Sequence, residues 1–197
     1  MIVHGCYNYD MRIIVGLGNP VPEYELTRHN AGKRAVQFLA DQQHVRFERV
    51  GKVNASIAKL HAPIETLLVL PEKYMNESGE VVRAVLEYYK SAVTQAGYTE
   101  LVVVYDDLDI VFGEYKLGYG TGPKVHNGVS SVIEQLGTDR FWHGRIGIDS
   151  RDGERLIPGR DYVLQRMAES EIMQLQQSVF PLMQREIDQK VTLAVNS

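Results

Sequence analysis

Two kinds of segment alternate along the chain and differ in the spacing of their apolar residues. Short runs that are apolar throughout, typical of strands buried on both faces of a sheet, alternate with longer segments in which apolar residues recur every three or four positions, as in amphipathic helices. The predicted strands are Arg12–Leu17, an antiparallel pair within Val45–Leu60, Thr66–Leu70, Leu101–Tyr105, Gly113–Leu117 and Gly144–Ile148. The predicted helices are Ala31–Gln42, Gly79–Lys90, Gly128–Leu136 and Glu169–Ala194.

The order of these segments predicts a single α/β domain. Strands and helices follow one another without a low-complexity linker or an internal repeat, and 197 residues suffice for one full core. Because crossovers between parallel strands are right-handed, we expect a twisted, mixed but largely parallel sheet with helices on both faces. Residues 1–10 precede the first predicted strand and are interpreted as an N-terminal extension, with residues 11–197 forming the domain.

Capping and breaking residues predict where several helices begin and end. Ser78 and Asn127 are expected to be N-caps, because short polar side chains can accept hydrogen bonds from the first backbone amides of a helix. Gly137 is expected to end the third helix. Pro181 lacks an amide hydrogen and is expected to kink or divide the last helical segment.

Composition narrows the class of protein. The single cysteine, Cys6, excludes an internal disulfide, and no apolar run approaches the roughly 20 residues that a membrane helix needs. Residues 1–10 are too polar for a secretory leader, so we expect a cytoplasmic protein without a membrane partner. A formal net charge of −4 argues against a surface that binds nucleic acid throughout, but it allows a local basic patch in the arginine-rich stretch Arg140–Arg166.

Three polar clusters follow apolar runs and mark the candidate site. His29 lies in a short turn after the first predicted strand, Asn76 follows the run that ends at Leu70, and Asp106 follows the run that ends at Tyr105. Because ligands of open α/β sheets bind at the carboxyl ends of the strands, we expect these side chains to converge. An imidazole that can exchange a proton near neutral pH, beside a carboxylate, indicates an enzyme.

Other kinds of site fit these residues less well. The run Gly16-Leu17-Gly18 lacks the third glycine of a dinucleotide-binding fingerprint, because a valine occupies that position. Ser78 is not set in a Gly-x-Ser-x-Gly elbow, so a serine nucleophile is not indicated. A metal held by His29, Asp106 and His126 is conceivable, but the chain has no His-x-x-x-His or comparable local pair, and we expect neither a metal nor another cofactor.

Four motifs in a fixed order resemble those of bacterial-type peptidyl-tRNA hydrolases. They are Val15–Tyr24 with Thr27–Gly32, Pro71–Gly79, Val104–Asp109 followed by Gly113, and His126–Gly128 with Arg145–Ile148. The resemblance extends from about Met11 to about Met167 and is highly specific. The loop Tyr119–Val125 departs from the family's glycine-rich pattern and is longer, which bears on substrate selectivity more than on the chemistry.

The resemblance implies hydrolysis of the ester between a peptide and the 3′-terminal ribose of tRNA, without a metal or cofactor. His29 matches the family's general base, and Asp106 matches the residue that orients the imidazole and stabilises its charged form. The residues that match substrate-binding positions, of which three are amides able to donate and accept hydrogen bonds, are Asn19, Tyr24, Tyr74, Met75, Asn76 and Asn127.

The partner implied by the resemblance is peptidyl-tRNA, bound by a monomer. Phosphate contacts then come from a local basic rim, for which Lys124 and Arg145 are the candidates, unless Arg145 pairs with Asp106 or Asp109 within the protein. Two other functions stay open at this point. One is a non-catalytic RNA-binding relative, whose sign would be the loss of His29 or Asp106. The other is an esterase or amidase for another acylated substrate, which the altered loop alone favours.

Overall fold

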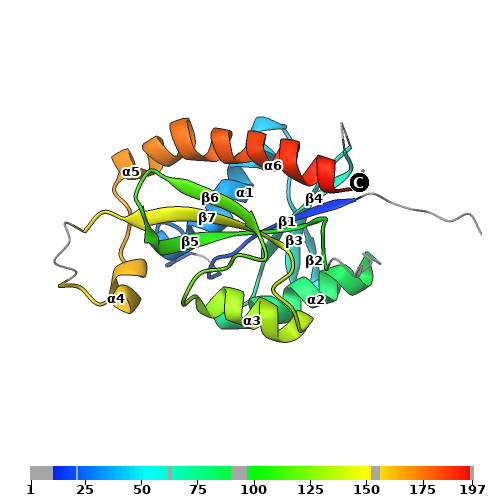
Figure 1. The fold of residues 1–197 in the computed structure, drawn as a ribbon, viewed down its shortest axis with the longest axis horizontal. Helices are drawn as coiled ribbons and strands as arrows, with labels where there is room; N and C mark the ends of the chain where they lie inside the picture. The colour runs from blue at the N-terminus through cyan, green and yellow to red at the C-terminus, as the bar shows by residue number, and fades with distance from the viewer. Residues whose placement is uncertain (1–10, 21, 62–63, 90–96, 152–155, 196–197) are drawn as a thin grey trace, which may run out of the picture.

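A seven-stranded mixed sheet forms the middle layer of the protein, with strand order β2-β3-β4-β1-β5-β7-β6 (Figure 1). The structure is a computed structural model of the chain and describes residues 11–20, 22–61, 64–89, 97–151 and 156–195, so the predicted extension 1–10 lies outside the described residues. The strands are β1 (Arg12–Gly16), β2 (Glu48–Val50), β3 (Ala55–Leu60), β4 (Thr66–Pro71), β5 (Leu101–Val111), β6 (Tyr115–Tyr119) and β7 (Trp142–Asp149). Strands β4, β1, β5 and β7 run parallel, whereas β2, β3 and β6 pair antiparallel, which confirms the predicted mixed, largely parallel sheet.

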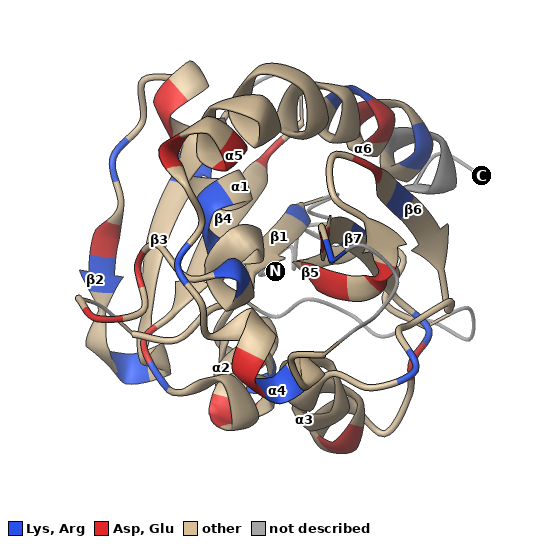
Figure 2. Ribbon diagram, turned by 90° about the vertical axis from the view of Figure 1, so that its left-hand side faces the viewer, with Lys and Arg blue, Asp and Glu red and all other residues tan. Residues whose placement is uncertain are grey.

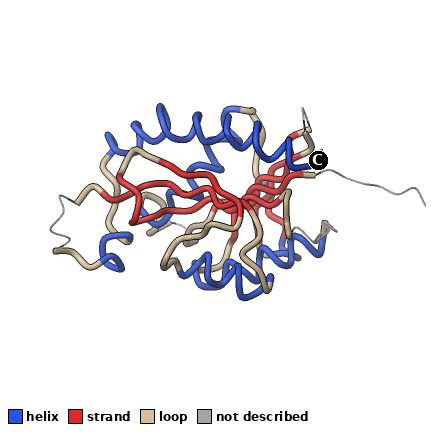
Figure 3. The backbone as a smooth tube through the Cα atoms, in the orientation of Figure 1, coloured by secondary structure: helices blue, strands red, loops and turns tan. Residues whose placement is uncertain are grey.

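Helices cover both faces of the sheet, as predicted (Figures 1 and 3). They are α1 (Ala31–Gln42), α2 (Ser78–Tyr88), α3 (Asn127–Leu136), α4 (Gly159–Val163), α5 (Glu169–Gln174) and α6 (Phe180–Val195). Helices α1, α5 and α6 lie on one face and α2 and α3 on the other, while α4 lies beyond one end of the sheet. None of the helices in the described residues is long and apolar enough to cross a membrane.

Each face of the sheet buries its own apolar core, because successive residues of a strand point to opposite faces. Ile14 of β1 and Val104 of β5 pack with α1 and α6. Ile13 and Val103, their neighbours in the same strands, pack with α2 and α3. The uninterrupted apolar runs of the sequence are therefore central strands covered on both sides.

Strand β5 continues to Val111, well past its predicted end at Tyr105. Asp106 and Asp107 continue the parallel pairing with β7 and are buried. Polar residues normally end a buried strand, since an unpaired charge is costly to bury. Here each carboxylate has N–H donors from other segments, so the strand can continue through them.

Two of the three predicted helix caps are wrong. Ser78 is the first residue of α2 rather than its cap, and its hydroxyl has no hydrogen-bond partner among the described residues. Asn127 is likewise the first residue of α3, and the cap is His126, whose ring accepts from two backbone amides. A single turn of the tighter 3-10 helix, Met75–Glu77, directly precedes α2, so Ser78 already has helical backbone and cannot be the cap. Gly137 ends α3 with a φ of 68°, which confirms the third prediction.

The C-terminal helical segment is divided near Pro181, as predicted. A wide π turn, Leu175–Val179, separates α5 from α6. Because Pro181 cannot donate a backbone hydrogen bond to the preceding turn, the chain widens there instead of continuing as one straight helix.

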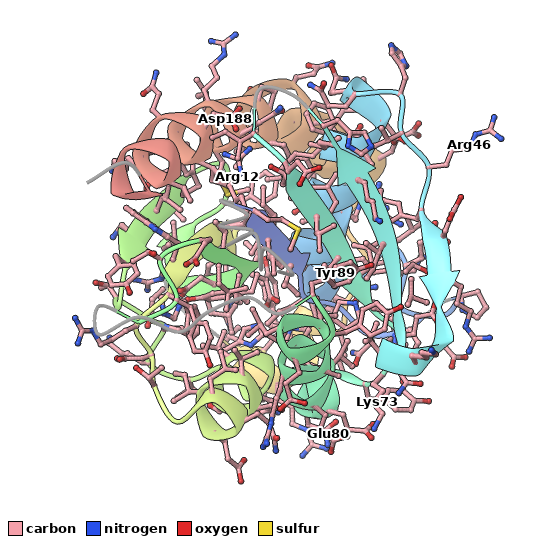
Figure 4. The ribbon with its side chains drawn as sticks, turned by 90° about the vertical axis from the view of Figure 1, so that its right-hand side faces the viewer. Arg12, Arg46, Lys73, Glu80, Tyr89 and Asp188 are labelled. Atoms are coloured by element: carbon pink, nitrogen blue, oxygen red, sulfur yellow. The ribbon has the colours of Figure 1, made fainter. Side chains whose placement is uncertain are left out.

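Arg12, at the start of β1, ties the sheet to α6 at the end opposite the site (Figure 4). The Arg12 side chain is almost fully buried; its Nη2 lies 2.7 Å from Oδ1 of Asp188, and its Nε donates to the hydroxyl of Thr66 on β4 at 3.2 Å. This pairing satisfies a charge that would otherwise be costly to bury and holds α6 across the sheet.

Candidate active site

The carboxyl ends of β1 and β5 and the loop that follows β4 open into one cavity of about 600 Å³. Figure 2 views the molecule from this end, with the ends of the strands near the centre and α4 below them, beside α2 and α3. The cavity brings together most of the predicted site residues, namely Asn19, His29, Met75, Asn76, Asp106 and Asn127. Asn19, His29, Met75, Asn76 and Asp106 lie on or after the parallel strands β1, β4 and β5, whose carboxyl ends share one edge of the sheet. Asn127 reaches the same cavity from the start of α3.

His29 and Asp106 form a hydrogen-bonded pair in the wall of the cavity. His29 lies in the turn Arg28–Asn30 between β1 and α1, and its Nδ1 lies 2.8 Å from Oδ1 of Asp106. Because the carboxylate accepts, Nδ1 carries the proton and Nε2 is the basic atom of the ring. Burial disfavours the charged ring, but the charge of Asp106 and the hydrogen bond to it outweigh burial and raise the pKa of His29 above its ordinary value.

Asp106 accepts hydrogen bonds from two imidazole rings at the same oxygen. Nε2 of His126 lies 3.1 Å from Oδ1 of Asp106, the same oxygen that accepts from Nδ1 of His29. Complete burial favours the neutral carboxyl, but the two rings and their hydrogen bonds outweigh burial and hold the pKa of Asp106 below its ordinary value. Asp106 is therefore an anion that faces His29.

His126 is held in one tautomer by the helix that it caps. Its Nδ1 accepts from the backbone N–H groups of Gly128 at 3.1 Å and Val129 at 3.2 Å. A ring nitrogen that accepts two N–H groups carries no proton, so the proton of His126 lies on Nε2 and is donated to Asp106. One side chain thus links the first turn of α3 to the carboxylate partner of His29.

This tautomer does not fit a metal site at the same residues. Ligand atoms of His29, Asp106 and His126 lie within 4.8 Å of one another, which is a metal-like spacing. A neutral imidazole can ligate a metal only through its unprotonated nitrogen, and in His126 that nitrogen is occupied by the backbone of α3. The hydrogen bonds of the cluster therefore match a proton-transfer site and not a metal cage.

Asn19 presents a donor to the cavity. Its Oδ1 accepts from the backbone N–H of Met75 at 2.9 Å, and its own backbone N–H donates to Oδ1 of the buried Asn30 at 2.8 Å. Because the backbone N–H of Met75 needs an acceptor, this bond assigns Oδ1 of Asn19 to the Met75 side and Nδ2 to the other side. In the described part of the protein no hydrogen bond occupies Nδ2 of Asn19, so this N–H group can meet an acceptor in the cavity.

The other predicted binding residues divide into two groups. Asn76 and Asn127 are exposed and line the cavity, Asn76 from the turn before α2 and Asn127 from the first position of α3, and Met75 is a buried part of the same lining. Tyr24 and Tyr74 do not line it, and their rings form an edge-to-face pair with centroids 6.5 Å apart.

The two predicted tRNA contacts lie outside this cavity. Lys124 is exposed, lies 3.7 Å from Asp109, and lines a neighbouring hollow of about 320 Å³. Arg145 lines another hollow, and its Nε lies 2.7 Å from Oδ2 of Asp107. The alternative that Arg145 pairs with an acidic residue of the protein is confirmed, but its partner is Asp107 and not Asp106 or Asp109. Asp106 is bonded to the two imidazoles, Asp109 lies beside Lys124, and Asp107 points to the opposite face of the strand from Asp106.

Several residues of the lining were not predicted from the sequence, among them His126 and the residues of α4, as well as Leu108 and Val125. His126 was noted only within a motif and as a conceivable metal ligand, although a histidine before Asn-Gly at a helix start is compatible with a cap. Helix α4 supplies Arg160 and Val163, with Leu164 directly after it. Its five residues are too short for an apolar period to stand out.

The described lining of the cavity contains no serine, threonine, cysteine or lysine. Ser78 is fully buried and is not part of it. Both ring nitrogens of His126 are already bonded, to Asp106 and to the backbone of α3, so the imidazole with a nitrogen open to the cavity is that of His29. Without a side-chain nucleophile in the described lining, the attacking group that this site can activate is water. The fold and the site define an α/β enzyme in which a histidine–aspartate pair can activate a water molecule.

Comparison with known proteins identifies the family. A sequence profile of the family described as peptidyl-tRNA hydrolase matches residues 13–196. A peptidyl-tRNA hydrolase of Bacillus cereus (strain Q1) is 39% identical over 170 residues, which cover 86% of this chain and 87% of the relative. The crystal structure of peptidyl-tRNA hydrolase from Acinetobacter baumannii has a TM-score of 0.77 at 28% identity and covers 95% of this chain and 94% of that one. The chain belongs to the peptidyl-tRNA hydrolase family.

Proposed function

We propose that this protein hydrolyses the ester bond between a peptide and the 3′-terminal ribose of tRNA, with His29 as the general base and Asp106 as the group that orients it. The observation that carries these roles is the 2.8 Å contact between Nδ1 of His29 and Oδ1 of Asp106 in a cavity without a described side-chain nucleophile. Family membership supports the reaction and its substrate.

In the proposed mechanism, Nε2 of His29 takes a proton from water as the water oxygen attacks the ester carbonyl. The carbonyl oxygen becomes an oxyanion, and the imidazolium that forms is stabilised by the adjacent Asp106 carboxylate. The tetrahedral intermediate then breaks at the bond to the ribose 3′ oxygen, which receives the proton from His29. The products are a peptide with a free carboxyl group and a tRNA with a free 3′ hydroxyl.

The amides have different proposed roles. Nδ2 of Asn19 is a fixed donor and suits the carbonyl oxygen, where negative charge develops. Asn76 and Asn127 are unconstrained by described hydrogen bonds and suit the peptide backbone, which offers both donors and acceptors. Met75 adds a buried apolar side chain to the same lining, and the pair of Tyr24 and Tyr74 is proposed to extend the binding surface beyond the cavity.

The experiment that tests the function compares two substrates that carry the same N-blocked amino acid. One is the ester on full-length tRNA and the other is a simple alkyl ester without tRNA. We expect the protein to hydrolyse the first far more efficiently. Binding without hydrolysis would indicate a non-catalytic RNA-binding relative, and equal rates on both would indicate a general esterase.

Removing the peptide-facing amides is expected to weaken substrate use without altering proton transfer. For Asn127→Ala and Asn76→Ala we expect kcat/KM to fall about tenfold each, since each loses hydrogen bonds to the substrate. In a plot of kcat/KM against pH, the acidic limb, which is the rise on the acidic side where His29 loses its proton, should keep its position. Gln42→Ala, which removes an exposed amide at the end of α1, is the matched control. A shift of the acidic limb in either site variant would contradict this division of roles.

Lys124 is proposed to contact a tRNA phosphate. For Lys124→Gln we expect weaker binding of every tRNA tested and a plot of log affinity against log salt that is flatter by about one unit, because one fewer counterion is released. Lys52→Gln removes the same charge from an exposed position of the turn Gly51–Val53 and is the control. An unchanged salt slope for Lys124→Gln would remove this residue from the interface.

Arg145 is proposed as a second phosphate contact, although its pairing with Asp107 already uses one edge of the guanidinium.

We also propose that the protein acts as a monomer in the cytoplasm. The support for a monomer is that one chain supplies both members of the His29–Asp106 pair and the amides around them. The support for the compartment is the proposed substrate, which forms where ribosomes translate.

A further inference from the structure

Arg160 brings a permanent positive charge to the active-site cavity. The anionic group in the same lining, Asp106, is already bonded to His29 and His126. Arg160 is exposed, and in the described part of the chain it forms no ion pair or hydrogen bond. Asp161, the next residue, is not in the cavity lining. The cavity therefore contains one cation that no described residue neutralises.

The face of α4 that lines the cavity is set by helical spacing. Arg160, Val163 and Leu164 are three and four residues apart, so they lie on the same side of the helix, and all three line the cavity. Val163 and Leu164 make this wall apolar. Within such a wall, a guanidinium keeps its charge at the solvent edge and can exchange water for an anionic ligand.

Tyr162, on the other side of α4, anchors the helix to the protein. Its ring is buried, with the guanidinium carbon of Arg28 4.7 Å and that of Arg151 4.5 Å from the ring centroid. Its hydroxyl donates to the backbone carbonyl of Ile148 in β7 at 3.2 Å. These contacts attach α4 to the turn that carries His29 and to the end of β7, and so they set where Arg160 stands relative to the base.

We propose that Arg160 binds the phosphodiester that joins the last two nucleotides of the tRNA. This rests on the proposed function. The ester that is cleaved lies on the 3′ oxygen of the terminal ribose, and the nearest negative charge on the nucleic acid is the phosphodiester on the 5′ side of that same ribose. With the ester carbonyl beside His29, this phosphate passes close to the cavity lining. A guanidinium matches it because its planar N–H groups can bond two phosphate oxygens at once.

Such a contact gives the site a means of recognising a nucleotide ester. The phosphodiester is present in every peptidyl-tRNA, whereas an acidic side chain occurs only in some peptides. A cation reserved for the phosphate therefore favours all intended substrates over esters of simple alcohols. Lys124 and Arg145 lie outside this cavity, so their proposed contacts would be with other parts of the tRNA.

The test uses three esters of the same N-acetylated amino acid: full-length tRNA, the dinucleotide CpA with one phosphodiester, and adenosine with none. For Arg160→Gln we expect the preference for CpA over adenosine, taken as the ratio of kcat/KM values, to fall about tenfold, with a similar loss on tRNA relative to adenosine. Arg160→Lys should retain part of the preference, since it keeps the charge but loses the planar pair of donors. Arg46→Gln, which removes an exposed arginine that projects into solvent (Figure 4), should keep the wild-type ratio.

An unchanged CpA-to-adenosine ratio in Arg160→Gln would overturn the proposal. So would a loss that appears on adenosine esters of acidic peptides and not on those of neutral ones, because that result would assign Arg160 to a peptide carboxylate. Failure of the proposed function would be seen in another measurement, because the wild-type protein would then not cleave the ester on full-length tRNA. Thermal melting of each variant checks that α4 is still anchored.

Discussion

The His29→Ala variant is expected to fold like the wild type and to hydrolyse peptidyl-tRNA about two to four orders of magnitude more slowly, which is the usual contribution of a positioned proton-transfer group. The fold should survive because Asp106, left without His29, keeps the N–H of His126. The measurement is single-turnover hydrolysis of N-blocked aminoacyl-tRNA, with thermal melting as the check on folding. Wild-type rates from a folded His29→Ala protein would exclude His29 as the base.

The pH dependence of the wild type provides a second test of the same residue. His29 acts as a base only when Nε2 is unprotonated, and Asp106 raises the pKa of His29 above its ordinary value of 6.5. Activity should therefore rise with pH through this raised pKa, and the acidic limb of kcat/KM should lie above pH 6.5. His61→Ala, which removes an exposed histidine, is the control and should leave both the rate and the limb unchanged.

The Asp106→Asn variant is expected to lose about two to four orders of magnitude in kcat through charge rather than geometry. Both imidazoles donate to the same atom, Oδ1, so a neutral amide oxygen at that place can still accept from His29 and His126. What it cannot do is stabilise the imidazolium that forms when His29 takes the proton. Retention of the wild-type rate would remove Asp106 from the mechanism.

The acidic limb shows why the rate falls in Asp106→Asn. Without the carboxylate charge, the burial of His29 is unopposed, so its pKa should drop and the limb should move to lower pH even as the maximal rate decreases. The comparison variant is His126→Asn, whose side-chain oxygen can still cap α3 but cannot reach Asp106. It should melt close to the wild type. Because Asp106 then interacts with His29 alone, the pKa of His29 should rise and the acidic limb should move to higher pH.

The positions of the strands and the central helices could be predicted from the sequence because their signals are local. The apolar run of β1 and the three- and four-residue spacing in α1 follow from which faces are buried, and α1 has the bounds that were predicted. The division near Pro181 was predictable for the same reason, since a missing amide acts on the adjacent turn. The four motifs made the family recognisable, and the roles of His29 and Asp106 came from that resemblance.

The end of β5, the cap of α3 and the placement of α4 could not be predicted in this way. Asp106 and Asp107 look like the polar end of a strand, and they stay in it only because His29, His126 and Arg145 supply N–H groups from elsewhere in the fold. Whether a polar residue can be buried depends on partners that are distant in sequence, and no local pattern records them.

The sequence by itself determined the layered α/β architecture, the family, and the residue types that the site would use. Tertiary structure alone decided their arrangement: six predicted side chains meet in one cavity while Tyr24 and Tyr74 stay outside it. It also decided that His126 donates to Asp106, since its tautomer is set by the backbone of α3, and that Arg160 faces the cavity. The reason is physical. Periodicity and propensity act over a few residues, whereas hydrogen bonds and unpaired charges in a site are settled only when the ends of separate strands and helices are brought together.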